Sequence, residues 1–290
     1  MTKFLDVRIQ PVGGELAKTV GLFEGTSIAN YTGLLATDLL NSIRGQHLLI
    51  ATHGFNVDRE NGIASLSNWA SLLQLQQGSA FVGLLWPGDS VWAHGLDYPG
   101  EARVADDAGA LIAAFLDENF QQAASVSFAS HSLGARVVLA AISKMTMRVR
   151  RLTLMAGAID DNCLITEFAD AAKNIDQISV LASMKDTVLS HLFPLGNFVA
   201  GILTVGHPWW HAAIGHCGPV ETWPGNFGAP FMIPDVWSFD HGNYLQINEP
   251  PAPALALPVV VPAQGAAEPV GGAPGWQEAF TAGFESTRFR

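Results

Sequence analysis

The stretch "SVSFASHSLGARVVLAAI", residues 125–142, predicts a strand that runs directly into a helix. Its first half is a short run of small and apolar residues, which is typical of a buried strand. Its second half has apolar residues at spacings of three and four, which predicts a helix over residues 133–146. Ser132 lies at the junction, because no loop residues separate the two elements.

Four further apolar runs predict strands of the same sheet. They begin at His47, Ala80, Arg151 and Asp176. Residues 100–120, ahead of the junction strand, have a helical pattern. Continuous apolar runs fit a parallel sheet that is covered on both faces. Alternation of strands and helices therefore predicts an α/β fold with a doubly wound, mostly parallel sheet, whose site loops lie at the carboxyl ends of the strands.

Composition limits the class of protein. The chain has 290 residues, of which 49% are apolar and 14% charged, so it can bury a large core. A net charge of −11 argues against a nucleic-acid partner, because phosphate binding needs a basic face. No apolar run reaches the roughly 18 residues of a membrane span, and residues 1–14 do not resemble a signal peptide. We therefore expect a cytoplasmic protein without a membrane span.

Two regions differ from the rest of the chain. Residues 188–240 are rich in Gly, Pro and aromatic residues, which predicts an inserted cap with a short helix near Trp209. Residues 249–290 begin with a Pro/Ala/Gly-rich stretch, which predicts a tail that is extended or packed on the surface. One α/β domain is therefore expected over residues 1–248. Cys163 and Cys217 have no paired spacing and are expected to be small buried thiols.

The junction has the context of a nucleophile elbow, in which a serine lies on a sharp strand-to-helix turn. Ser130 and Gly134, two residues before and after Ser132, are both small, as a tight turn requires. The turn places the Leu133 N–H at a helix N-terminus, where it can stabilise an oxyanion. The pentapeptide alone leaves an alternative open, because serine is also a good helix N-cap.

Three more residues complete a possible catalytic set. The strand from His47 ends in His53-Gly54, after which the Phe55 N–H can act as a second oxyanion donor, although an ordinary turn fits too. Asp186 follows the strand from Asp176 and can orient a base, although it can equally cap a helix. His241 follows in a loop. The order Ser, Asp, His is the one that this type of elbow requires.

These motifs together resemble the α/β-hydrolase superfamily. More narrowly, "HGFN" (53–56), "LLWPGDS" (84–90) and "SHSLGARV" (130–137) are similar to bacterial α/β hydrolases of uncharacterised function. The resemblance covers roughly residues 45–245, and Ser130 departs from the usual glycine at that position of the elbow.

The resemblance implies a role for each residue of the set. Ser132 would be the nucleophile, His241 the general base and Asp186 the orienting acid. The Phe55 and Leu133 N–H groups would form the oxyanion hole. The cap would then be an insertion between the acid and the histidine of an α/β-hydrolase fold. The resemblance supplies no substrate.

Other acids, bases and metal ligands are weaker candidates. His131 and Asp240 adjoin Ser132 and His241, and neighbours at a sharp turn point apart. Asp160 and Asp161, after the strand from Arg151, are reserve acids. A third group, with histidine spacing suited to zinc but no accompanying glutamate, comprises His207, His211 and His216. The missing glutamate makes us expect no metal, and the absence of a phosphate-binding loop, dinucleotide motif or haem signature makes us expect no nucleotide or redox cofactor.

Aromatic residues suggest an apolar substrate. A pocket for an acyl group can be built from Trp86, Trp92, Phe193, Phe198, Trp209, Trp210 and Phe227, although the same side chains can simply pack the cap on the core. The favoured function is hydrolysis of small carboxylic esters with apolar acyl or alkyl groups through an acyl-enzyme on Ser132. Two alternatives remain: a non-catalytic scaffold with this fold, or an acyltransferase or thioesterase with the same triad.

Overall fold

The computed structural model describes residues 1–73, 75, 77–89, 98–191, 212–220, 225–226, 231–233, 235 and 238–244, with only the backbone at 98–101 and 231. Most of the expected cap and the whole expected tail lie outside these residues, as does Trp209. The boundary expected at residue 248 lies outside them too.

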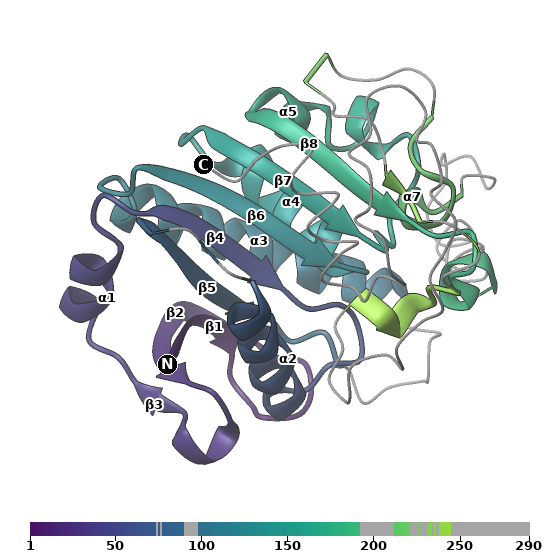
Figure 1. Ribbon diagram of the computed structural model, residues 1–290. Coiled ribbons are helices and arrows are strands. Elements are labelled where there is room, and N and C mark those ends of the chain that lie inside the picture. Colours follow the sequence, from purple (N-terminus) through teal and green to yellow (C-terminus); the bar gives the residue numbers. More distant parts are fainter. Residues whose placement is uncertain are drawn as a thin grey trace.

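The described part of the chain forms one nine-stranded sheet with the order β3-β2-β1-β5-β4-β6-β7-β8-β9 (Figure 1). The strands are β1 Thr2–Arg8, β2 Leu16–Gly25, β3 Thr32–Gly33, β4 His47–Thr52, β5 Ser79–Leu85, β6 Ser125–His131, β7 Val149–Met155, β8 Ile175–Ala182 and β9 Phe231–Met232. From β1 to β9 all neighbours are parallel, whereas β2 pairs antiparallel with β1 and β3. The predicted mostly parallel sheet and its five predicted strands are therefore confirmed.

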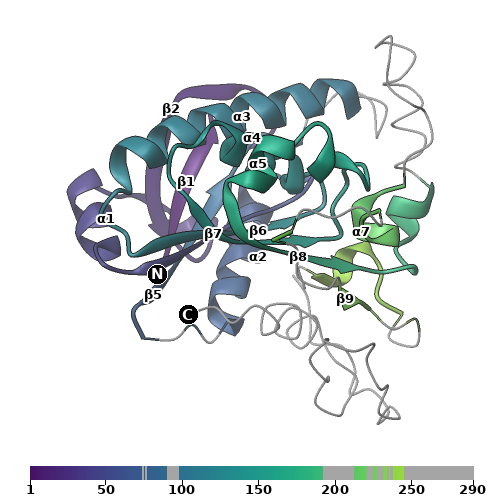
Figure 2. The ribbon, with the colours of Figure 1, turned by 90° about the horizontal axis from the view of Figure 1, so that it is seen from above.

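Helices cover both faces of the sheet, as the doubly wound prediction requires. They are α1 Ala36–Ile43, α2 Arg59–Leu72, α3 Tyr98–Asn119, α4 Gly134–Lys144, α5 Ala169–Lys173 and α7 Ile214–Cys217, with 3-10 turns η1 Ile28–Asn30, η2 Cys163–Ile165 and η4 His241–Tyr244. Figure 2 shows α3, α4 and α5 on one face of the sheet and α2 on the other. The predicted helices at 100–120 and 133–146 correspond to α3 and α4.

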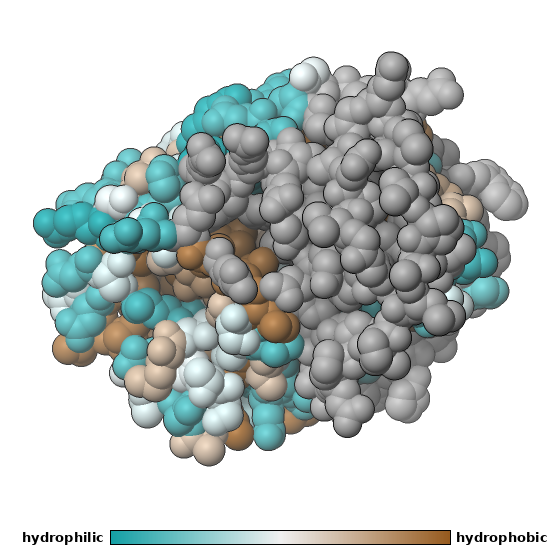
Figure 3. All heavy atoms as spheres, in the orientation of Figure 1, coloured by the Kyte–Doolittle hydropathy of each residue, from teal (hydrophilic) through white to brown (hydrophobic). Residues whose placement is uncertain are grey.

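The core is centred on β4 and β6, which pair from His47↔Ser125 to Thr52↔Ser130. Leu48, Ile50 and Phe128 are fully buried, because both faces of these strands meet other elements. Burial of apolar side chains on both sides explains why the strands read as continuous apolar runs. On the face drawn in Figure 3, described hydrophobic residues gather in the middle and hydrophilic ones along the left edge.

Strand β1 was not predicted from the sequence. Its residues are almost all buried, including the charged side chains of Asp6 and Arg8. Because polar and apolar residues are mixed in a fully buried strand, neither alternation nor a continuous apolar run reveals it. β1 forms a hairpin with β2 and runs parallel to β5, so it places its last residue beside the carboxyl end of β5.

Candidate active site

The nucleophile candidate lies on a strained turn between β6 and α4. Ser132 has a φ of 52°, a left-handed conformation that costs energy for a residue with a side chain. Two glycines allow the turn to approach the end of β4. A Cβ on Gly54 would lie 2.6 Å from the Ser132 Cβ, and a Cβ on Gly134 would collide with the His53 carbonyl oxygen. Only glycine at these positions permits this geometry.

A chain of hydrogen bonds joins the three predicted residues. The Ser132 Oγ lies 2.9 Å from the His241 Nε2, and the His241 Nδ1 lies 2.7 Å from the Asp186 Oδ2. Asp186 is fully buried, whereas Ser132 keeps 6% of its surface exposed. With a carboxylate on Nδ1, the imidazole carries its proton there and leaves Nε2 free to accept the serine proton.

The two N-cap alternatives have different outcomes. The N-cap of α4 is Leu133, with no side-chain capping bond, and the Ser132 hydroxyl contacts His241 instead. Asp186 acts both as a helix cap and as the hydrogen-bond partner of His241. Its Oδ1 accepts the Leu189 N–H at 2.9 Å, as a helix cap would, while its Oδ2 is the atom bound by His241. The helix that begins at residue 187 thus orients the carboxylate.

The loop that carries His241 is anchored on several sides. His131 donates from Nε2 to the His241 carbonyl at 2.8 Å, and Trp69 donates from Nε1 to the Tyr244 carbonyl at 2.9 Å. Asp240 accepts the N–H groups of Thr187 at 2.9 Å and of His241 at 2.8 Å. Burial opposes ionisation of Asp240, but these hydrogen bonds hold the pKa of its carboxyl below its usual value. Asp240 therefore shapes the loop.

Ser183, the first residue after β8, connects the acid to the returning chain. Its N–H donates to the Gly215 carbonyl at 3.0 Å, and its Oγ donates to the Phe239 carbonyl at 2.6 Å. Its own carbonyl accepts the His216 Nδ1–H at 3.1 Å. Ser183 therefore joins three segments. One of its partners is His216, which the sequence had offered as a metal ligand. The other two histidines of that group, His207 and His211, lie outside the described residues.

The two backbone N–H groups that the sequence offered as oxyanion donors follow Gly54 and Ser132 directly in the chain. Neither the Phe55 nor the Leu133 N–H donates a hydrogen bond within the described part of the chain. Leu133 immediately precedes α4, so its N–H also lies at the positive end of a helix dipole. Both features suit stabilisation of a developing negative charge.

His53 and Trp86 support the turn that leads to Phe55. The two rings stack with centroids 5.9 Å apart, and Trp86 donates from Nε1 to the His53 carbonyl at 3.0 Å. Trp86 is fully buried. Its indole is used in packing and in this hydrogen bond, and its place in a substrate pocket stays a prediction. The other expected pocket residues, Trp92, Phe193, Phe198, Trp209, Trp210 and Phe227, lie outside the described residues.

Two histidines beside the site are kept neutral by burial. Desolvation lowers the pKa of His53 and of His131 to about 3. For His131 the nearby His241 lowers the pKa further, and its hydrogen bond to the His241 carbonyl only partly opposes this. Neither histidine is then a proton acceptor near neutral pH. His241 is the imidazole in contact with the serine, as the sequence predicted against His131.

The remaining candidates take no part in this set. Asp161 donates its N–H to the Ala212 carbonyl at 2.9 Å, and Asp160 forms an isolated bridge with Ala213, while the acid on His241 is Asp186. Both cysteines are free thiols; Cys163 is buried, and Cys217, against expectation, is exposed.

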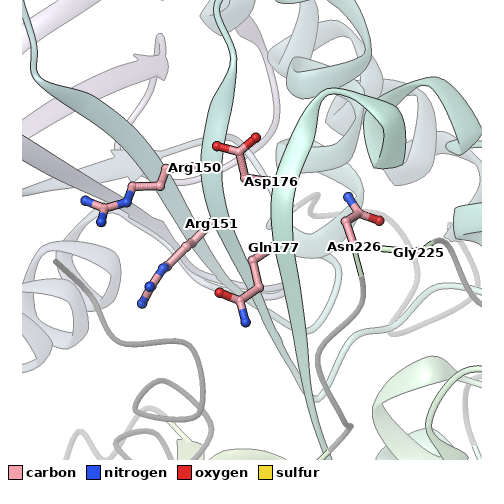
Figure 4. A pocket seen from close by; sticks show the side chains of 6 residues that line it. All are labelled: Arg150, Arg151, Asp176, Gln177, Gly225 and Asn226. Atoms are coloured by element: carbon pink, nitrogen blue, oxygen red, sulfur yellow. The ribbon is translucent and has the colours of Figure 1, made fainter.

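A separate hollow lies at the opposite, amino end of β7 and β8. It has a volume of about 380 Å³ and is lined by Arg150, Arg151, Asp176, Gln177, Gly225 and Asn226 (Figure 4). It therefore includes none of the residues that form the hydrogen-bonded set.

Comparison with known proteins agrees with the fold. The family described as an alpha/beta hydrolase of unknown function (DUF900) matches residues 31–194. No curated protein matches the sequence. No helix within the described ranges is long and apolar enough to cross a membrane.

Several solved structures are also matched, all with low similarity. One, of the metagenome-derived lipolytic enzymes LipS and LipT, has 13% identity and a TM-score of 0.36, over 71% of this chain and 91% of that one. Esterase B from Lactobacillus rhamnosis has 12% identity and a TM-score of 0.38, over 69% and 70%. Carboxyl esterase 2 from the fungus Tuber melanosporum has 12% identity and a TM-score of 0.38, over 84% and 83%. Values this low carry no argument about the reaction.

Proposed function

The chain belongs to the α/β-hydrolase family of unknown function, and from this premise we propose that it is a serine hydrolase that cleaves carboxylic esters. The observation that carries the proposal is the chain from Ser132 through His241 to the buried Asp186, with donor–acceptor distances of 2.9 and 2.7 Å. A serine that is merely structural needs neither a base on its hydroxyl nor a buried acid behind that base.

The proposed reaction has two steps. The His241 Nε2 takes the Ser132 proton while the Oγ attacks the ester carbonyl, and the resulting oxyanion accepts the Phe55 and Leu133 N–H groups. The imidazolium then returns the proton to the leaving alcohol, and the acyl group stays on Ser132. Water, activated by the same imidazole, releases the acid. Asp186 holds the Nδ1 proton throughout and stabilises the imidazolium.

The substrate class rests on composition and not on a described pocket. The aromatic side chains of residues 188–240 favour an ester with apolar acyl or alkyl groups. Ester hydrolysis is favoured over peptide hydrolysis for the same reason, since an apolar acyl site offers no polar groups to hold a peptide backbone.

A fluorophosphonate probe and a series of p-nitrophenyl esters test the proposal. The wild-type protein should be labelled on Ser132, give a burst of p-nitrophenol, and prefer one range of acyl chain lengths. Ser132→Ala should lose both labelling and turnover. Ser130→Ala is the matched control, because Ser130 is a buried serine two residues away whose Oγ has no hydrogen-bond partner among the described residues. This variant should retain both activities.

Two results would contradict the proposal. A wild-type protein that is folded but unreactive toward the probe would be a non-catalytic scaffold. Full turnover by Ser132→Ala would exclude an acyl-enzyme on this residue. Labelling accompanied by transfer to added alcohol or thiol acceptors, without hydrolysis, would identify an acyltransferase instead.

A further inference from the structure

Arg8 is a fully buried arginine whose guanidinium is hydrogen-bonded throughout. Its side chain has no exposed surface. Nη1 donates to the carbonyl oxygens of Val57 and Trp86, both at 2.9 Å, and Nη2 donates to the Asp89 Oδ1. Weaker contacts reach the Gln10 and Pro11 carbonyls at 3.4 and 3.3 Å. The planar fork of arginine suits this geometry, because it can serve several acceptors in one plane.

The three closer acceptors, Val57, Trp86 and Asp89, lie in two different loops. Val57 belongs to the loop that follows β4, and Trp86 and Asp89 to the loop that follows β5. Asp89 also reaches the β1–β2 connection, since its Oδ2 accepts the Gly13 N–H at 3.1 Å. A single side chain at the end of β1 therefore ties together three segments at the carboxyl end of the sheet.

The loop after β4 is the one that carries Phe55. Asn56, between Phe55 and Val57, has a left-handed φ of 58° and donates its N–H to the Gly88 carbonyl at 2.6 Å. A non-glycine residue holds this conformation only where its surroundings impose it. The bond to Gly88 on one side and the Arg8 bond to Val57 on the other supply that constraint. The direction of the Phe55 N–H is thus fixed by contacts on the following two residues.

Stability alone does not account for this arrangement. The Arg59 Nε lies 2.9 Å from the Asp6 Oδ2, and Asp6 also accepts the backbone N–H of Arg8 at 2.9 Å. Arg8, Asp6 and Asp89 are buried, and Arg59 is partly buried beside them. Burial raises the pKa of Asp6 in spite of these partners. A buried ionic group of this kind often stabilises a protein no more than apolar residues of the same size would. What apolar residues cannot supply is a directed bond to the Val57 and Trp86 carbonyls.

We propose that Arg8 is a positioning residue for the oxyanion hole, which it sets by clamping the loop of Phe55 to the loop of Trp86 and Asp89. The inference rests on the proposed function, because it assigns a purpose to the Phe55 N–H. It also explains Asp89 of the "LLWPGDS" motif, whose carboxylate holds both Arg8 and the Gly13 N–H.

Arg8→Lys tests the proposal, with Asp89→Asn as a second variant. Lysine keeps the charge but loses the fork, and asparagine keeps the shape of Asp89 but weakens the Arg8 contact. Two quantities are measured for each protein: kcat and KM for p-nitrophenyl butyrate, and the inhibition constant of an alkyl trifluoromethyl ketone, which forms an anionic adduct on the serine. All measurements are made at a temperature at which circular dichroism shows every variant to be folded.

Arg136→Lys is the matched control. Arg136 is also mostly buried and forms ion pairs with Asp106 and Glu167, and among the described residues it has no hydrogen bond or ion pair with either loop. For Arg8→Lys we expect kcat to fall and the inhibition constant to rise by about 10-fold or more, since loss of one oxyanion donor costs about 100- to 1,000-fold. KM should change much less. Asp89→Asn should change kcat and the inhibition constant in the same directions by smaller factors. Arg136→Lys should change neither quantity.

The outcomes separate the two proposals. If the wild type reacts with a fluorophosphonate and Arg8→Lys binds the ketone as tightly as Arg136→Lys does, the positioning role is wrong and the proposed function stands. If Arg8→Lys does not fold, Asp89→Asn decides by the same comparison. If the wild type does not react at Ser132, both proposals fail.

Discussion

The two ends of the parallel sheet are built differently. At the carboxyl end, Ser132 and Asn56 have left-handed backbone conformations, and the carboxylate of Asp186 is fully buried. At the amino end, around the hollow of Figure 4, Arg151 makes no hydrogen bond or ion pair within the described residues, and Asp176 pairs with Arg148 while half exposed. Strain and burial are thus concentrated at one end.

The difference indicates where substitutions should matter. When a buried charged group is removed by mutation, its hydrogen-bond partner stays buried without a compensating charge. The loss of stability is then several kcal/mol. An exposed ion pair is screened by water and typically contributes about 1 kcal/mol or less. Equivalent substitutions at the two ends should therefore have very different consequences, and four predictions follow from this difference.

Asp186→Asn should have the largest effect. An amide in place of the carboxylate cannot hold the Nδ1 proton of His241 with a negative charge, so kcat for an activated ester should fall by about 10³- to 10⁴-fold with little change in KM. Asp176→Asn, the same substitution at the amino end of β8, is the control and should stay within about twofold of the wild type. Similar losses in both variants would mean that the two ends do not differ as described.

Gly134→Ala should both destabilise the protein and reduce activity. The added Cβ collides with the His53 carbonyl oxygen, so the turn or the end of β4 must move, at about 2–3 kcal/mol of unfolding free energy measured in urea. The move also displaces the Leu133 N–H. Gly225, at the amino-end hollow, has no atom within 4 Å of a Cβ, so Gly225→Ala should be nearly neutral. A neutral Gly134→Ala would contradict the close approach.

Acidification should destabilise the protein through the two buried histidines. Both have a pKa of about 3 when folded, against about 6.5 when unfolded. Between these values the unfolded chain binds more protons, so stability is lost as pH falls. Each histidine should contribute about 1.4 kcal/mol per pH unit between about pH 6 and 4.

The pH dependence of stability can be assigned to individual histidines by mutation. In urea titrations across this range, His131→Gln should remove about half of the slope that the two histidines produce. His191→Gln, at an exposed position, should leave the slope as in the wild type. An unchanged slope in His131→Gln would show that this histidine already titrates in the folded state.

Arg151→Gln, at the amino end, should have the smallest effect. Burial and the neighbouring charge of Arg150 lower the pKa of Arg151 to about 10, so the side chain is charged at neutral pH, and no carboxylate in the described part of the chain pairs with it. Its removal should change the free energy of unfolding by less than about 0.5 kcal/mol and leave ester turnover unaltered. A loss comparable to that of Gly134→Ala would mean that the amino end also depends on buried contacts.

The sequence predicted the elements whose signal is local. The elbow at Ser132 and the central strands follow from residue spacing and apolar runs, and the order of Ser132, Asp186 and His241 follows from position in the chain. The sequence allowed two interpretations of Asp186, a helix cap and an acid that orients the base. One carboxylate oxygen caps the helix, and the other contacts His241. Local patterns could not have separated them, since a helix cap and a base-orienting acid occupy the same place after a strand.

The missed features depend on partners that are distant in sequence. The acceptors of Arg8 lie 49 and 78 residues away, and only the folded sheet brings them together. The acidic residue Asp89 in a sequence motif indicated that a cationic side chain lay nearby, but it did not indicate which residue carried that charge. Trp86 was predicted for a pocket wall, although an aromatic residue after a strand suits the core as well. The direction of its indole N–H is set by His53, which folding places beneath it.

The three bonds of Ser183 have a consequence for how the protein could diversify. Ser183 itself precedes residues 192–211, and its bonds fasten the chain after them, first through Gly215 and His216 and then, shortly before His241, through Phe239. The acid and the base are therefore attached to the sheet independently of the sequence that connects them. A stretch bounded in this way is exchangeable: another segment grafted between the same attachment points would change which molecules are accepted while the proton-transfer machinery stayed intact.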